Sequence, residues 1–154
     1  MGGDAAALER YFAALKERNV SRGAHMGTLL GVEVIEVGKD HVVMRLPFRE
    51  DLRRGGGIFH GGAIMALADH VAGAVFNTDP RVPAAGGTGL TTDFNVSFLL
   101  SAAPGEALLA TGSVLRRGKN VTFMQIAVTG ETSKRAVALC RTTYLTVPRD
   151  RLGR

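Results

Sequence analysis

One long apolar segment constrains the fold more than any other feature of this chain. Residues 60–76 read HGGAIMALADHVAGAVF. The segment is apolar almost all round and spans about four turns at 3.6 residues per turn, so a helix here must be buried by other elements. We therefore predict a central helix, with Met65 and Phe76 in the core.

β-like segments flank this helix on both sides. Residues 32–37 and 42–46 are rich in β-branched residues and enclose the turn Gly38-Lys39-Asp40, which predicts a hairpin. After a loop at residues 77–89, turns at strand-meander spacing separate four more segments: 90–100, 107–115, 121–128 and 136–147. This order predicts an α+β fold with an antiparallel sheet wrapped around the central helix.

The length of the chain favours a single domain. It has 154 residues, of which 45% are hydrophobic, and shows no internal repeat or linker. Apolar and charged residues alternate at helical spacing in residues 5–18, which predicts an amphipathic helix. We expect an N-terminal helix and lead-in over residues 1–25, the α+β domain over 26–148 and a basic tail over 149–154.

Composition excludes several classes of protein. The single cysteine, Cys140, cannot form an internal disulfide or a Cys-based metal site, so the cytoplasm is the expected compartment. No apolar run approaches the roughly 18 residues that cross a bilayer, so we expect no membrane partner. The net charge of +5 comes largely from the tail and the turns, without a binding motif, so we expect no nucleic-acid partner.

Asp69 is the first candidate functional residue. It lies in the middle of the predicted helix, and His70 is the only other ionisable residue beyond the first turn. Burying an unpaired carboxylate costs several kcal/mol, so Asp69 must be paired, have a raised pKa or face a cleft. The pattern fits a functional carboxylate, and equally a residue at a solvent-facing edge or one that binds a backbone group.

The start of the helix is the second candidate feature. Gly61 and Gly62 occupy the first turn, where each disfavours a helix by up to about 1 kcal/mol relative to Ala. The first N–H groups of a helix are unpaired and lie at its positive end, so this bare start can bind a carbonyl oxygen that gains negative charge. Tight packing of the helix on the sheet is the alternative explanation. His60 could orient the same oxygen or cap the helix, and the histidines lack metal-ligand spacing.

The spacing of Gly61 and Asp69 has a consequence for the oligomeric state. Eight residues correspond to about 12 Å along a helix at 1.5 Å per residue. A donor and a base that act on one carbonyl carbon must both lie within about 3 to 3.5 Å of the reacting atoms. We therefore expect Gly61 of one subunit to face Asp69 of another in a two-fold dimer with two such sites.

Four short patterns together carry a resemblance to a known family. They are Gly57-x-x-His60-Gly61-Gly62, Asp69 nine residues past the His, Thr91-x-Asp93-x-Asn95, and Arg117-Gly118-Lys119. Over roughly residues 26–147 the chain resembles the hotdog-fold thioesterases of the PaaI and thioesterase superfamily member 2 type. The resemblance implies a homodimer or homotetramer that hydrolyses acyl-CoA thioesters without a metal or cofactor.

The resemblance also implies a role for each matched residue. Asp69 would be the general base or nucleophile, Gly61 the backbone donor that polarises the thioester carbonyl, and His60 its neighbour. Thr91 would help to hold the attacking water, although an ordinary strand threonine fits its position too. The predicted substrate-binding residues are Gly62, Arg117, Gly118, Lys119 and Asn120. The last four form a turn that would meet coenzyme A phosphates or, alternatively, a solvated hairpin end.

One residue departs from the family pattern, and two other functions fit the sequence. Relatives commonly carry Asn or Gln six residues before the His, where this chain has Arg54. A hydratase or dehydratase of the same fold would use His60 and Asp69 as an acid and base pair, and a non-catalytic acyl-CoA binder would need neither. The sequence does not determine which acyl group the substrate carries, because the shape of the pocket depends on how Leu29, Phe59, Phe94 and Phe98 pack.

Overall fold

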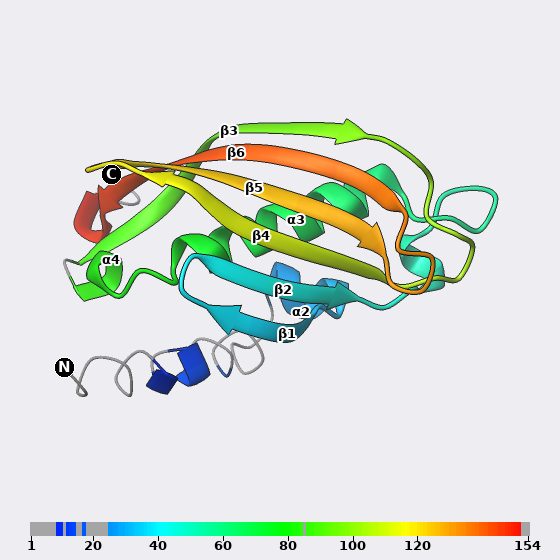
Figure 1. The fold of residues 1–154 in the computed structure, drawn as a ribbon, viewed down its shortest axis with the longest axis horizontal. Coiled ribbons are helices and arrows are strands. Elements are labelled where there is room, and N and C mark those ends of the chain that lie inside the picture. Colours follow the sequence, from blue (N-terminus) through cyan, green and yellow to red (C-terminus); the bar gives the residue numbers. More distant parts are fainter. Residues whose placement is uncertain (1–8, 11, 15–16, 18–24, 85, 152–154) are drawn as a thin grey trace.

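A computed structural model describes residues 9–10, 12–14, 17, 25–84 and 86–151 (Figure 1). Of the predicted N-terminal helix, residues 9–10, 12–14 and 17 are helical, and the rest lies outside the described residues. The longest helix is α3, Gly61–Phe76. The strands are β1 (Glu33–Gly38), β2 (His41–Leu46), β3 (Gly87–Phe98), β4 (Leu108–Arg117), β5 (Val121–Gly130) and β6 (Ala136–Pro148).

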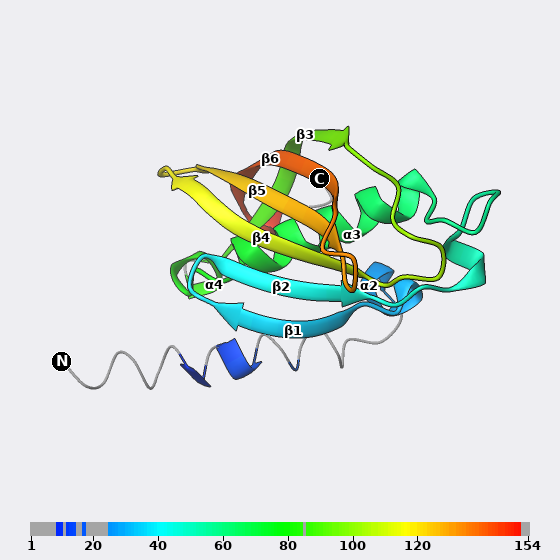
Figure 2. The ribbon, with the colours of Figure 1, turned by 45° about the vertical axis from the view of Figure 1, so that its right-hand side comes forward.

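The strands form one antiparallel sheet in the order β1-β2-β4-β5-β6-β3. The sheet curves around α3, and β1 and β3 are its two edges (Figures 1 and 2). The predicted hairpin is β1 and β2. Of the four later segments predicted at meander spacing, β4, β5 and β6 form a meander, whereas β3 pairs with β6 and not with β4. The predicted α+β class, an antiparallel sheet around a central helix, is confirmed.

The core lies between α3 and the concave face of the sheet. Leu67, Val71 and Val75 of α3 are fully buried. Burial of each such side chain stabilises the fold by about 1.5 to 3 kcal/mol. A Cβ at Gly112 of β4 would lie 2.5 Å from Val75 and 2.7 Å from Val71, so this glycine allows the close approach of α3 to the sheet.

Short helices are the main difference from the predicted elements. The loop predicted at residues 77–89 contains a short helix, α4, Arg81–Ala84. Strand β3 begins at Gly87, two residues before the predicted end of this loop. Asp79 starts α4, since its side chain accepts a hydrogen bond of 3.0 Å from the Arg81 N–H. Helix α2, Met26–Leu30, was not predicted, and its cap is His25, which accepts from the Gly27 N–H at 3.1 Å. Two 3₁₀ turns, Glu50–Leu52 and Arg149–Arg151, complete the elements.

One stripe of α3 is exposed in the single chain. Phe76 is 1% exposed, as predicted, but Met65 is 41% exposed, so the prediction of a core Met65 is wrong. Gly62, Met65 and Asp69 are all exposed and follow one another at intervals of three and four residues, which places them on one helix face. The sheet and α2 cover the other faces of α3. In the part of the chain that the structure describes, no helix has the length and apolar character to cross a membrane.

Candidate active site

Two hydroxyl groups hold the carboxylate of Asp69. The Thr91 hydroxyl on β3 donates to Asp69 Oδ1 at 3.1 Å, and the Tyr144 hydroxyl on β6 lies 3.2 Å from the same oxygen. The Tyr144 hydroxyl also lies 3.3 Å from the backbone carbonyl oxygen of Asp69. Asp69 is thus both exposed and hydrogen-bonded. Its partners are side-chain hydroxyls, and sequence reasoning missed Tyr144.

The register of the sheet brings these hydroxyls together. Thr91 and Tyr144 are direct partners in the β3–β6 ladder, and the register shifts between Thr91 and Asp93. This places Thr92 in a β-bulge, a feature that bends a strand and often redirects a side chain beside a functional site. The Thr92 hydroxyl bonds instead to the Thr143 carbonyl oxygen at 3.0 Å. Of these two neighbouring threonines, Thr91 is thus the one whose hydroxyl contacts Asp69.

His60 caps the start of α3. Its Nδ1 accepts a hydrogen bond of 2.9 Å from the Gly62 N–H. The Gly62 amide, which the sequence predicted to bind substrate, is therefore already paired with the imidazole. Within the described residues no hydrogen bond uses the Gly61 N–H. The Gly61 amide is thus the bare donor at the positive end of α3.

A groove of about 440 Å³ lies beside the Gly61 amide. Most of the residues that line it are apolar and one is charged: Arg54, Ile58, Phe59, Gly61, Ile64, Phe98, Leu99, Leu100, Ser101 and Ala102. Two of the four predicted pocket residues, Phe59 and Phe98, are among them. A Cβ at Gly61 would lie 3.3 Å from the Phe98 ring, so the glycine also allows this ring to approach the helix.

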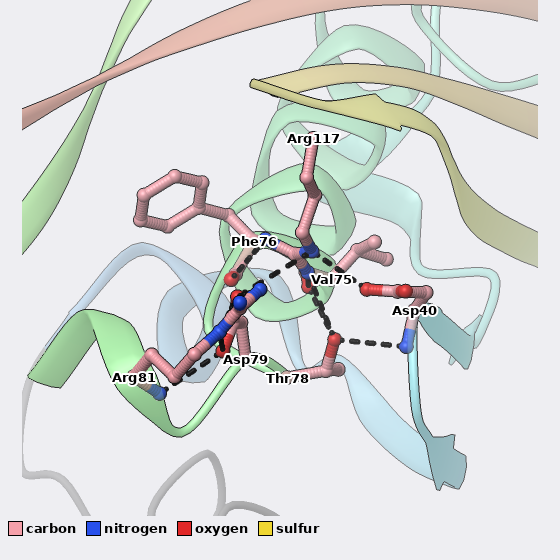
Figure 3. A network of polar contacts seen from close by, with 7 residues as sticks. All are labelled: Asp40, Val75, Phe76, Thr78, Asp79, Arg81 and Arg117. Atoms are coloured by element: carbon pink, nitrogen blue, oxygen red, sulfur yellow. Dashed lines mark hydrogen bonds and ion pairs between the residues drawn. The ribbon is translucent and has the colours of Figure 1, made fainter. Parts of the chain in front are cut away.

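Arg117 points into the protein rather than away from it. Its side chain is 13% exposed and donates to Asp40 at 2.7 Å. It also donates to the carbonyl oxygens of Val75 and Phe76, at 3.1 and 3.2 Å, and lies 3.2 Å from the Thr78 hydroxyl (Figure 3). The last carbonyl groups of a helix lack partners within the helix. Arg117 therefore caps the C-terminal end of α3.

The rest of the predicted phosphate-binding turn is exposed. Gly118, Lys119 and Asn120 follow the end of β4. Gly118 and Lys119 line a hollow of about 300 Å³ together with Arg81. The side-chain hydrogen bond from Arg81 lowers the pKa of Asp79, which keeps this carboxylate charged between Arg81 and Arg117 (Figure 3).

The structure leaves the two ends of the predicted site apart. Gly61 and Asp69 belong to the same helix, so the rise of about 1.5 Å per residue keeps them about 12 Å apart along its axis. The groove beside Gly61 does not include Asp69 among its lining residues. One chain thus presents a bare amide at one point and a held carboxylate at another.

The histidines next to the site pack together. The His25 and His70 rings stack with centroids 5.8 Å apart, and burial lowers the pKa of His70. Among the described residues, no group of three or more His, Cys, Asp or Glu side chains could hold a metal ion.

Comparison with known proteins agrees with this architecture. Residues 56–137 match the family model of the thioesterase superfamily. The human acyl-coenzyme A thioesterase 13 is 25% identical over 132 residues, which is 85% of this chain and 87% of that protein.

Solved structures show the same fold. The Escherichia coli PaaI protein from the phenylacetic acid degradation operon superimposes with a TM-score of 0.76 at 21% identity, covering 88% of this chain and 93% of that one. Zebrafish thioesterase superfamily member 2 gives a TM-score of 0.76 at 25% identity, covering 87% and 97%.

The antiparallel sheet, the central helix and the similar solved structures define a hotdog-fold protein. The chain belongs to the thioesterase superfamily, and the predicted family resemblance and enzyme class, a thioester hydrolase, are confirmed.

Proposed function

We propose that this protein hydrolyses acyl-CoA thioesters at sites shared between two subunits, with Asp69 of one chain and the Gly61 amide of the other. The supporting observation is the exposed carboxylate of Asp69, which Thr91 and Tyr144 hold in place. The bare Gly61 N–H supplies the second element, a donor aimed outward from the positive end of α3.

The reaction follows from these two groups. Asp69 either takes a proton from a water molecule that attacks the thioester carbonyl carbon, or attacks this carbon itself and forms an acyl-aspartyl anhydride, which water then hydrolyses to the free acid. The carbonyl oxygen gains negative charge as the new C–O bond forms, and the Gly61 N–H stabilises this charge. The C–S bond then breaks, and coenzyme A leaves as the thiol with the proton that Asp69 took from water or, on the nucleophilic route, with a proton from solvent.

The exposed stripe of α3 and the open edge of β3 support a homodimer. Met65 lies between Gly62 and Asp69 on the exposed helix face, where a second helix would bury it. A partner related by a two-fold axis would bring its own Gly61 to Asp69, and the reverse, which produces two equal sites. Pairing of two such dimers into a homotetramer, and a cytoplasmic location, remain predictions from the sequence.

The substrate class rests on the relatives and on the exposed turn. The human relative is named an acyl-coenzyme A thioesterase. Lys119, with Gly118 and Asn120 beside it, offers an exposed charge to the coenzyme A phosphates, whereas the Gly118 N–H already donates to the Val121 carbonyl oxygen at 2.7 Å. Arg117 contributes less than predicted to such binding, since its guanidinium already bonds to Asp40 and to the end of α3.

A hydratase or dehydratase of the same fold is the main rival. Its chemistry would need the His60 side chain as an acid or base, whereas His60 here caps α3 through Nδ1. Replacing His60 with Ala would abolish the activity of a hydratase. In a thioesterase the same change would give a milder loss, because the Gly61 backbone donor remains.

A thiol-release assay across a panel of acyl-CoAs tests the proposal. The wild type should release free thiol from at least one acyl chain, and Asp69→Asn should reduce turnover by at least about a hundredfold. No thiol release from any acyl-CoA would favour a non-catalytic binder. Near-normal turnover in Asp69→Asn would remove Asp69 from the mechanism.

A further inference from the structure

Tyr144 is the one partner of Asp69 that the sequence did not suggest. It lies on β6, 75 residues from Asp69 along the chain, and its ring is buried against Phe76 with centroids 5.4 Å apart. A Cβ at Gly89 would lie 2.8 Å from the Tyr144 ring and 2.7 Å from the Phe76 ring. The absence of a side chain at Gly89 therefore makes room for both rings beneath β3.

The hydroxyl of Tyr144 is placed to act as a donor. It meets the face of α3 beside Asp69 and reaches both the carboxylate and the backbone carbonyl of this residue. Burial raises the pKa of Tyr144 to about 12, so the phenol keeps its proton at neutral pH. The Tyr144 hydroxyl is therefore the donor and Asp69 Oδ1 the acceptor.

Both hydroxyls contact the same carboxylate oxygen. Thr91 and Tyr144 each reach Oδ1 of Asp69, at 3.1 and 3.2 Å. No side chain or amide in the described part of the chain donates to Oδ2. One oxygen is thus fixed from two strands, and the lone pairs of the other remain available.

We propose that Tyr144 is a positioning residue for Asp69: together with Thr91 it fixes Oδ1, and so directs Oδ2 toward the water or the thioester carbonyl carbon. This inference rests on the proposed function, because it assigns the reacting atom of that same site. The buried ring of Tyr144 belongs to the rigid core, so it fixes the orientation of a carboxylate on an exposed helix face.

The test is Tyr144→Phe, which keeps the ring and removes only the hydroxyl. We expect kcat to fall about tenfold with KM within about twofold of the wild type, because orientation in the transition state is lost while substrate contacts remain. Thr142→Val is the matched control. It removes another buried hydroxyl from β6, one that bonds to the Asp93 carbonyl oxygen at 2.7 Å, and should leave kcat within about twofold.

A double-mutant cycle separates positioning from general destabilisation. Adding Tyr144→Phe to Asp69→Asn should cause no further loss of the residual turnover, since the hydroxyl acts through the carboxylate. An active Tyr144→Phe, an equal loss in Thr142→Val, or an additive loss in the double mutant would overturn the inference. Failure of the proposed function is distinct, because the wild type would then release no thiol or Asp69→Asn would stay active.

Discussion

Thr91 Oγ1 lies 3.1 Å from Asp69 Oδ1, although the residues lie on different elements and are 22 positions apart. The family resemblance implied that Thr91 would help to hold the attacking water. In the structure its hydroxyl contacts the carboxylate itself, so its first effect is on the position of Asp69.

We predict that Thr91→Val lowers kcat by about tenfold, since a hydrogen bond to a charged group contributes about 1.5 kcal/mol or more. Thr92→Val is the control, because the Thr92 hydroxyl bonds to the Thr143 carbonyl and does not reach Asp69. Steady-state kinetics on the best acyl-CoA of the panel would measure both variants. Equal kcat values for the two would contradict a direct role of Thr91.

The donor at Gly61 can be removed without removing the helix. His60 has φ −69° and ψ 138°, which suits a residue before proline, and the first helical position tolerates proline. Gly61→Pro should therefore fold and lose at least about a hundredfold in kcat, the usual effect of losing one oxyanion donor. Gly61→Ala keeps the N–H and adds a Cβ against Phe98, so it measures the steric effect alone.

The same variant tests the shared site. Neither Asp69→Ala nor Gly61→Pro should be active alone. After mixing and subunit exchange, heterodimers should regain activity, because one of their two sites combines an intact Asp69 with an intact Gly61. Absence of recovery, with exchange demonstrated by mass spectrometry, would place both residues outside a shared site.

Lys119 should contribute to binding rather than to turnover. We predict that Lys119→Gln raises KM about fivefold with little change in kcat, and that added salt reduces the difference from the wild type because it screens an exposed charge. Lys134→Gln is the matched control, since Lys134 lies in the turn at the opposite end of β5. An unchanged KM for Lys119→Gln would remove this turn from the substrate site.

Sequence patterns predicted the fold because its main elements have strong periodicity. Helix α3 is 16 residues long, and the strands are short segments of β-forming residues with recognisable turn residues between them. The helices α2 and α4 were missed, since five and four residues show no period and their starts depend on local contacts of His25 and Asp79. The prediction of a core Met65 was wrong because α3 is apolar almost all round, and the sequence does not show which face of such a helix the sheet leaves exposed.

The site was predicted only as far as its residues follow a local pattern. Gly61, with His60 before it, is recognisable at a helix start, and Asp69 stands out as a charge in an apolar run. Tyr144 is brought to Asp69 by the register of β3 and β6, which a single sequence does not specify. Arg117 belongs to a basic turn in the sequence. Its side chain nevertheless bonds to the C-terminal end of α3, because the end of β4 lies against that end of the helix.

The role of Arg117 yields a prediction on stability. Arg117→Met should lower the free energy of unfolding by about 3 kcal/mol, because the Asp40 carboxylate and the Phe76 carbonyl oxygen lose their donor. Arg116→Met is the control at an exposed neighbour and should change stability by less than about 0.5 kcal/mol. Urea denaturation followed by circular dichroism measures both. Equal midpoints for the two variants would show that Arg117 does not hold the end of α3, and a raised KM in Arg117→Met at unchanged stability would return Arg117 to the substrate site.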